Sequence, residues 1–154
     1  MRWSRLAGAL CAAVALAALA CAPASAAPAG PQVLPDPWRF AGRTVVAPNT
    51  AEFLVDPNGE LRGITSGAVF DRLFRDRSHR DFSLRVEDFQ VGTNLSDSAY
   101  LARYSNGAVF LVTNGRKWGI PSSAVMDKYN FNWRTIVDVS NPVLDSIPTG
   151  PNWG

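Results

Sequence analysis

One pattern of strand, turn, strand and helix is written twice in this chain, and it limits the possible folds more than any other feature. In the second copy, the apolar run 109–112 meets the turn Asn114-Gly115, a short run returns, and Ser122 precedes a helical pattern. Asn-Gly accepts positive φ at both central positions of a turn, which is typical of a β-hairpin. Ser122 is a predicted N-cap.

The first copy has the same order of features, with its turn at Asp56-Pro57-Asn58-Gly59. Phe53 and Phe110 are 57 positions apart, and one extra turn residue, Pro57, brings the spacing to 56. Six identical pairs then stay in step: Gly63/Gly119, Ile64/Ile120, Ser66/Ser122, Ala68/Ala124, Val69/Val125 and Asp71/Asp127. Identity spread over strand, turn and cap positions predicts a tandem duplication.

Each copy is expected to form a hairpin, a helix and a short strand. The helix faces are predicted from apolar spacing at Val69, Phe70, Leu73, Phe74 in one copy and Val125, Met126, Tyr129 in the other. Asn130 is expected to end the second helix in a left-handed conformation, and strands are expected at 40–46 and 136–139. The predicted class is α+β: two tandem β-hairpin–helix–strand repeats, 38–98 and 99–154, packed as one small domain with helices over a shared sheet.

The chain opens with features of an export signal. Arg2 and Arg5 precede the apolar run 6–20, and Ala24-Ser25-Ala26 offers a cleavage pattern. We therefore expect a signal peptide at 1–26, a Pro/Ala-rich linker at 27–37, and a secreted, extracellular protein with no transmembrane segment in the mature chain. The sequence leaves open lipid anchoring at Cys21, because Ala18-Leu19-Ala20-Cys21 is similar to a lipoprotein box.

Cleavage changes the chemistry that remains. Cys11 and Cys21, the two cysteines of the chain, both lie in the leader, so the mature protein is predicted to be disulfide-free. The full chain has 15 basic and 13 acidic residues, and loss of Arg2 and Arg5 leaves 13 of each. A neutral molecule has no overall attraction to polyanions, so no nucleic-acid partner is expected.

No catalytic, cofactor or metal residue is predicted. His79 is the single histidine and lies in the mixed-charge segment 75–81, where a surface role is favoured over an anion site. The adjacent carboxylates Glu87-Asp88 are too common a feature to indicate an acid/base pair. The turn at 56–60 lacks the spacing of a calcium loop.

An aromatic and basic set offers the one candidate ligand-binding site: Arg116, Trp118 and Trp133. Side chains alternate along a strand, so Arg116 and Trp118 are expected on one face and Lys117 on the other. Indole beside guanidinium suits a sugar ring or an anionic polymer. The alternative is that both tryptophans pack inside the fold.

The second copy resembles a short repeat of secreted and surface proteins of bacteria. The matching residues are Val109-Phe110-Leu111-Val112, Asn114-Gly115-Arg116-Lys117, Ile120-Pro121-Ser122, Asn130-Phe131-Asn132-Trp133, 136–140, Leu144 and Ile147-Pro148-Thr149-Gly150. The first copy matches only in its first half, because the Trp and the Ile-Pro-x-Gly ending are absent. Such repeats often accompany cell-wall hydrolases and peptidases, which implies an envelope-binding or accessory role without implying a ligand or a catalytic residue.

The expected function is a secreted, non-catalytic binding module for a cell-envelope component, glycan or peptidoglycan, with carbohydrate binding at the cell wall. The alternative is a protein-binding module, an inhibitor or accessory partner of a secreted enzyme. A small hydrolase is the least favoured class, because the sequence carries no catalytic motif.

Overall fold

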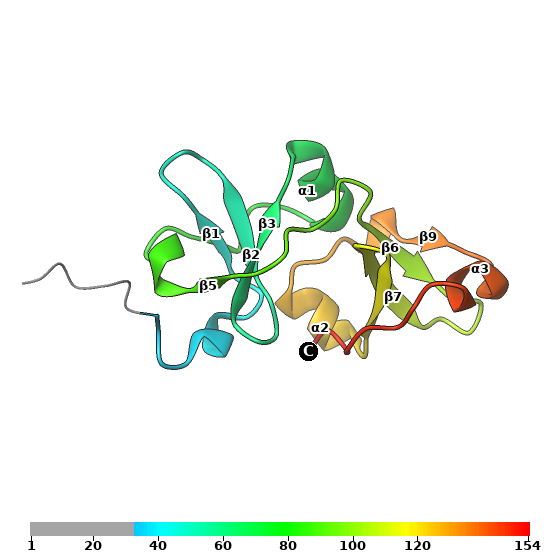
Figure 1. Cartoon of the computed structure of the whole chain (residues 1–154). Helices are drawn as coiled ribbons and strands as arrows, with labels where there is room; N and C mark the ends of the chain where they lie inside the picture. The colour runs from blue at the N-terminus through cyan, green and yellow to red at the C-terminus, as the bar shows by residue number, and fades with distance from the viewer. Residues whose placement is uncertain (1–32) are drawn as a thin grey trace, which may run out of the picture.

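The computed structural model describes residues 33–154, and these residues confirm the α+β class. They form nine strands in two sheets, together with three α-helices. Figure 1 shows the sheets at opposite ends of the molecule with helices α1 and α2 between them. The predicted signal peptide, both cysteines and residues 27–32 of the linker lie outside the described residues.

The first sheet has the strand order β4-β1-β2-β3-β5. Its strands are β1 Thr44–Val46, β2 Glu52–Val55, β3 Glu60–Ile64, β4 Arg80–Asp81 and β5 Gln90–Val91. The predicted strand at 40–46 is shorter than expected, because the 3-10 helix η1 Pro37–Phe40 and the turn through Gly42, at φ 92°, precede β1. A second 3-10 helix, η2 Val86–Asp88, leads into β5.

The second sheet has the order β8-β7-β6-β9. Its strands are β6 Tyr100–Arg103, β7 Val109–Thr113, β8 Arg116–Ile120 and β9 Val137–Asp138. The helical elements of this half are α2 Ser123–Lys128, η3 Trp133–Thr135 and α3 Asn141–Asp145. Strand β9 lies inside the predicted strand 136–139 and is shorter by a residue at each end.

The two sheets share one scheme of connections. In each, a three-stranded antiparallel meander is followed by a helix and by a short strand parallel to the first strand. The helix caps Ser66 and Ser122 are 56 positions apart. In the short parallel strands, Asp81 pairs with Val45 and Val137 pairs with Ala102, so Asp81 and Val137 are equivalent and are also 56 positions apart. This constant spacing puts Arg77 and Trp133 at equivalent steps of the two halves.

The correspondence extends to the end of each half. Gly92 N–H donates to Leu61 O at 2.9 Å, and Gly150 N–H donates to Lys117 O at 2.8 Å. Further along, Leu95 N–H donates to Gly63 O and Trp153 N–H donates to Gly119 O. The segments 92–95 and 150–153 therefore run along the outer edges of β3 and β8. The first copy lacks the Ile-Pro-x-Gly motif, but its Gly92 makes the same backbone contact as Gly150 of the second copy.

The prediction of one shared sheet is wrong for the same reason. A shared sheet requires a free strand edge in each half. The outer edge of β3 is taken by β5 and by residues 92–95, and that of β8 by residues 149–153. The helices instead lie between two separate sheets, in which the outer edges of β3 and β8 are covered.

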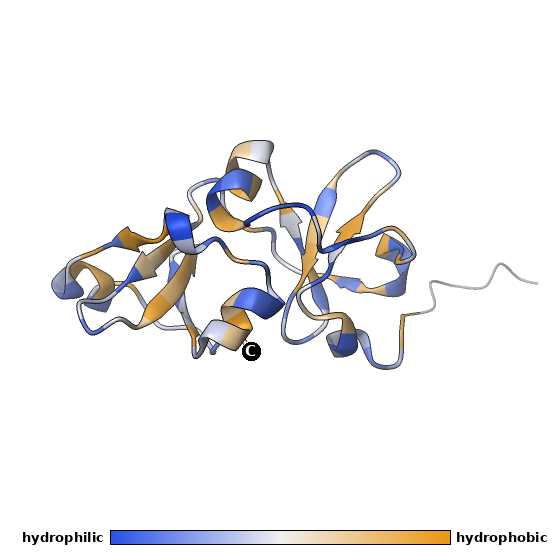
Figure 2. Cartoon of the chain, turned by 180° about the vertical axis from the view of Figure 1, so that it is seen from behind, coloured by the Kyte–Doolittle hydropathy of each residue, from blue (hydrophilic) through white to orange (hydrophobic). Residues whose placement is uncertain are grey.

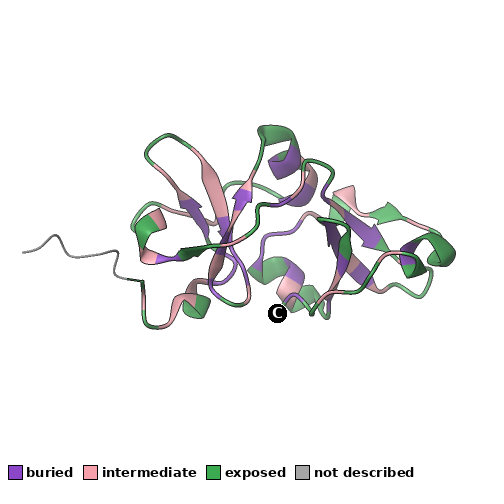
Figure 3. Ribbon diagram, in the orientation of Figure 1, coloured by how far each residue is buried: buried purple, intermediate pink, exposed green. Residues whose placement is uncertain are grey.

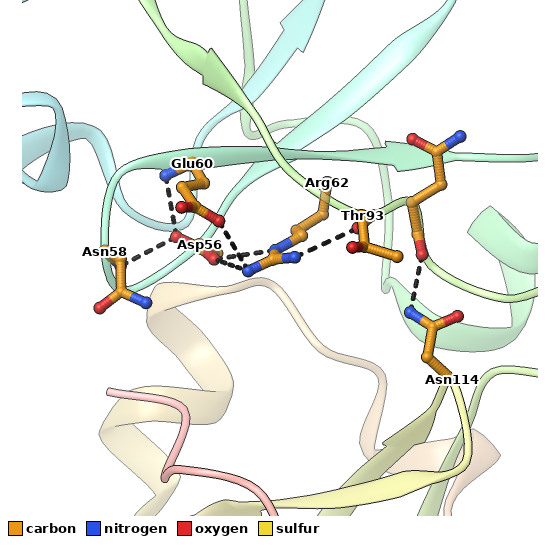
Figure 4. A network of polar contacts seen from close by, with 7 residues as sticks. Asp56, Asn58, Glu60, Arg62, Thr93 and Asn114 are labelled. Atoms are coloured by element: carbon orange, nitrogen blue, oxygen red, sulfur yellow. Dashed lines mark hydrogen bonds and ion pairs between the residues drawn. The ribbon is translucent and has the colours of Figure 1, made fainter.

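The two hairpin turns differ in conformation. Asn114 and Gly115 both have positive φ, 51° and 69°, as the sequence predicts. In the first hairpin only Gly59 does, at 81°, because Pro57 fixes a negative φ and lengthens the loop. The carboxylate of Asp56 closes that turn: it accepts from the backbone N–H groups of residues 58 and 60 and is ion-paired with Arg62 at 2.7 Å (Figure 4).

The helices begin and pack as their sequences predict. Helix α1 spans Gly67–Leu73, and the hydroxyls of Ser66 and Ser122 accept from backbone N–H groups three residues later, at 3.3 Å each. The predicted face of α1 is buried, and so are Met126 and Tyr129 of the second helix, while Val125 is only partly buried against the same core. Asn130 has φ 54°, which confirms the predicted left-handed helix end.

A core of both halves fills the space between the sheets. Its fully buried members include Leu54, Leu73, Leu111, Met126, Tyr129 and Phe131. Figure 3 shows buried segments where the helices and strands face one another, and Figure 2 shows the hydrophobic residues on the same strands. An antiparallel bridge between Phe74 and Phe131 links the segments that follow the two helices, so each half completes the core of the other.

Candidate functional site

Trp133 lies at the wall of a groove in the second half, and we call this hollow of about 360 Å³ the Trp133 groove. Trp133 is the first residue of η3. Asn132 Oδ1 accepts a hydrogen bond from the backbone N–H of Arg134 at 3.0 Å and so caps this short helix. Trp133 remains 44% exposed. The other lining residues used below are Val109, Ile120, Ser122, Ser123, Met126 and Asn152.

The walls of the Trp133 groove come from elements that are far apart in the sequence. Val109 and Ile120 face each other across β7 and β8. The serines lie at the start of α2, and Asn152 lies in the final segment against β8. The groove thus offers one exposed aromatic face, an amide and hydroxyls over an apolar floor. Such a combination suits a ligand with both C–H faces and hydroxyls.

Trp118 is placed differently from Trp133. Its ring lies edge-on to that of Trp153 at 6.1 Å, and its indole N–H is buried without a hydrogen-bond partner within residues 33–154. The backbone of Gly150 packs on the ring so closely that an added Cβ would lie 3.0 Å from it. Most of the Trp118 side chain is therefore engaged in packing, and Trp133 presents its ring to solvent.

Arg116 is exposed at the start of β8, and it lines neither of the two hollows that Trp133 borders. Lys117, its neighbour, is buried on the opposite face: Nζ donates to Leu144 O at 2.6 Å and to the Tyr104 hydroxyl at 2.8 Å. The three predicted site residues therefore do not come together: Arg116 is exposed at the start of β8, Trp118 is packed, and Trp133 lines a groove.

Arg77, His79 and Arg80 of the mixed-charge segment 75–81 are engaged within the first half. Arg80 pairs with the Glu52 carboxylate, and Arg77 lies 3.9 Å from the same carboxylate and 4.4 Å from the centre of the Phe70 ring. His79 is half-buried, with Nδ1 3.1 Å from Gly42 O, which indicates a structural role. These contacts use charges that an anion site would need.

Asp138 and Tyr129 are two of the groups whose pKa values are shifted. Hydrogen bonding from Arg103 lowers the pKa of the Asp138 carboxyl, and the two side chains form bonds of 2.7 and 3.1 Å. Burial raises the pKa of the Tyr129 hydroxyl well above its ordinary value, and the charge of Asp56 adds to the shift. None of the described groups with a shifted pKa value lines the Trp133 groove.

Within residues 33–154, no cluster of three or more His, Asp or Glu side chains is arranged to hold a metal ion. The helices described in this range are all too short or too polar to cross a membrane. What the described groove can offer chemically is contact, hydrogen bonding and ring stacking.

Sequence reasoning missed Asn152 as a groove residue. Its signal is a second repeated motif, Gly92-Thr93-Asn94-Leu95 and Gly150-Pro151-Asn152-Trp153. A Cβ on Gly63 would lie 2.4 Å from Asn94 Oδ1, and one on Gly119 would lie 2.5 Å from Asn152 Oδ1. Both asparagines therefore need a glycine opposite them, which ties the motif to the strand glycines that the sequence analysis had already paired.

Comparison of the chain with models of protein families, with curated proteins and with solved structures finds no match. The resemblance to a repeat of bacterial surface proteins therefore stays a prediction from the sequence.

Proposed function

We propose that this protein is a secreted, non-catalytic binding module for a cell-envelope component, a glycan such as peptidoglycan or another wall polysaccharide. One observation carries the proposal: Trp133 is 44% exposed at the wall of a groove that also presents Asn152 and the α2 serines. An aromatic face can stack on the C–H face of a sugar, while the amide and hydroxyls can bond its hydroxyls. The signal peptide predicted from the sequence favours the envelope as the place of action.

The test is sedimentation of residues 27–154 with insoluble peptidoglycan and with purified wall polysaccharides, followed by intrinsic fluorescence. We expect saturable binding that Trp133→Ala weakens at least about tenfold, because loss of one buried aromatic contact costs more than about 1.4 kcal/mol at a binding centre. The matched control is Trp38→Ala, since Trp38 is also exposed, at 54%, and lies in the other half. Equal binding by wild type and Trp133→Ala would refute the site.

Trp118 needs a gentler substitution, because its ring packs against Trp153 and Gly150. Trp118→Phe keeps an aromatic side chain and separates folding from recognition. If Trp118 acts only through packing, this variant binds as wild type does. Arg116→Gln is tested beside it, because the sequence placed Arg116 in the same site.

A second candidate function is a protein-binding module, an inhibitor or accessory partner of a secreted enzyme. It is favoured by exposed apolar side chains outside the groove: Phe82 is 76% exposed after β4, and Val91 is 59% exposed in β5. If this function holds, Phe82→Ser releases a co-purified exported protein, while Trp133→Ala does not. Binding to polysaccharide would then be absent from both variants and from the wild type.

A further inference from the structure

Trp133 forms the wall of a second hollow, on which a more specific inference rests. This second hollow, of about 280 Å³, is lined by Arg75, Asn132, Trp133 and Arg134, and we call it the Arg134 hollow. It and the Trp133 groove share Trp133. A ligand that covers the indole is thus in reach of both, the neutral groove and the two guanidinium groups.

The charge in the Arg134 hollow is available to a ligand. Arg134 is exposed and has no ion-pair partner within residues 33–154. Arg75 pairs with Asp127 at 2.7 Å, with side chains 44% and 61% exposed, so solvent screens this pair. By contrast, Arg62 is held by the buried Asp56 carboxylate, and Arg80 by the partly buried Glu52 carboxylate.

Guanidinium groups bind carboxylates and phosphates through paired, charge-assisted hydrogen bonds. The backbone around the Arg134 hollow is also fixed across the two halves: Arg75 N–H donates to Asn130 O at 2.9 Å, and Asn132 N–H donates to Leu73 O at 2.9 Å. The hollow is therefore built at the junction of the halves, where its two arginines are brought together from positions far apart in the sequence.

We propose that the ligand is an acidic polysaccharide, with a sugar ring stacked on Trp133 and an anionic substituent held in the Arg134 hollow. This inference rests on the proposed function and adds the charge of the glycan to it. The anionic group is a carboxylate or a phosphate diester, because a guanidinium group pairs with both.

The test compares one polymer in two charge states. The probes are a polysaccharide that contains glucuronic acid and the same polymer after reduction of its carboxyl groups to alcohols. A glycerol-phosphate wall polymer is the third probe. We expect an acidic polymer to bind wild-type protein at least about tenfold more tightly than the reduced one at low salt, because a guanidinium group forms stronger hydrogen bonds with an anion than with an alcohol. Raising the salt concentration is expected to narrow this difference.

Variants separate this inference from the proposed function. Arg134→Gln is expected to lower the affinity for the acidic polymer to about the affinity for the reduced polymer. The matched control is Arg85→Gln, because Arg85 is also exposed and lines neither hollow. Trp133→Ala is expected to weaken binding of both polymers.

Each outcome decides a different question. Equal binding of the acidic and reduced polymers, with dependence on Trp133, overturns the anionic ligand and leaves the glycan site standing. Loss of the preference in Arg116→Gln instead of Arg134→Gln also overturns it, in favour of the hairpin turn. Absence of any Trp133-dependent binding refutes the proposed function itself. Preference for only one acidic probe supports the inference and identifies the anionic group.

Discussion

Beside helix α1, the first half has a hollow of about 290 Å³ bordered by Glu52, Ser66 and Phe70. Three of its lining residues have equivalents in the Trp133 groove: Val109, Ser122 and Met126 of the second half. Arg77 stands where the second half has Trp133. Its guanidinium lies over the Phe70 ring and near the Glu52 carboxylate, which Arg80 also binds.

The difference between the two hollows teaches where a ligand can bind. In the first half, the charged side chains at the hollow's border satisfy one another, so a ligand would have to displace internal ion pairs. In the second half, Trp133 remains 44% exposed among the described residues 33–154. The two halves thus share a backbone pattern, but in the first half the charged side chains pair with one another, and in the second half the groove is open. Other equivalent positions of the two halves also differ in the type of side chain.

The largest loss of stability is expected when Leu61 of the first half is replaced by Lys, the residue at the equivalent position of the second half. Leu61 is fully buried, and its equivalent Lys117 is 6% exposed with two hydrogen-bond acceptors for its Nζ. The surroundings of Leu61 are apolar: Val45, Val55, Leu84 and Phe89. Leu61→Lys is expected to cost about 4 kcal/mol or more of the free energy of unfolding, because a cation would be buried unpaired. Urea denaturation measures this loss.

The matched control is Leu61→Met, which keeps volume and apolar character and is expected to cost less than about 1.5 kcal/mol. If Leu61→Lys is no worse than Leu61→Met, the outer face of the first sheet has access to solvent or to an acceptor, and the contrast with Lys117 fails.

A smaller loss is expected when the Glu52 charge is copied into the open groove. Val109 is 8% exposed, and Val109→Glu would place a carboxylate there without a cation. We expect a loss of about 2–3 kcal/mol in thermal or urea unfolding. Adding Ile136→Arg restores the counterpart of Arg80, since these positions are 56 apart, and is expected to recover part of the loss. Val109→Ala serves as the control for lost packing, and an equal effect in both single variants would contradict the argument.

Local chemistry explains how much of the fold the sequence predicts. Cap serines, the Asn114-Gly115 turn, the apolar face of α1 and the left-handed Asn130 depend on residues within a few positions of one another, and all were predicted. The separation into two sheets was not predicted. It depends on residues 92–95 and 150–153 covering strand edges about 30 positions earlier in the chain, which no local periodicity reports.

The same limit applies to the candidate site. Alternation places Trp118 on a face of β8, but only the return of Trp153 and Gly150 shows that this face is covered. Trp133 follows a helix end, where no periodicity applies, and its exposure comes from the 3-10 turn that Asn132 closes. Arg134 and Arg75 come together because the segments after the two helices pair, a contact between positions more than fifty apart.

The smallest effect is expected at the last core position of the helices, where the first half has Leu73 and the second has Tyr129, both fully buried. The Tyr129 hydroxyl has no hydrogen-bond partner within residues 33–154. Tyr129→Phe removes this buried polar group and keeps the ring between Phe131 and Trp153. We expect the free energy of unfolding at pH 7 to be unchanged or to rise by up to about 1 kcal/mol.

The pH dependence gives this prediction its sign. Burial raises the pKa of Tyr129 in the folded state above the unfolded value near 10, so the folded state binds the proton more tightly. The stability is thus fully present below about pH 10 and falls as the pH rises further, because only the unfolded chain ionises readily. Tyr129→Phe removes this source of alkaline loss, and urea unfolding at pH 7 and about pH 11 measures the difference. An identical alkaline loss in both proteins would mean that Tyr129 reaches solvent or an acceptor, and would remove the contrast with Leu73.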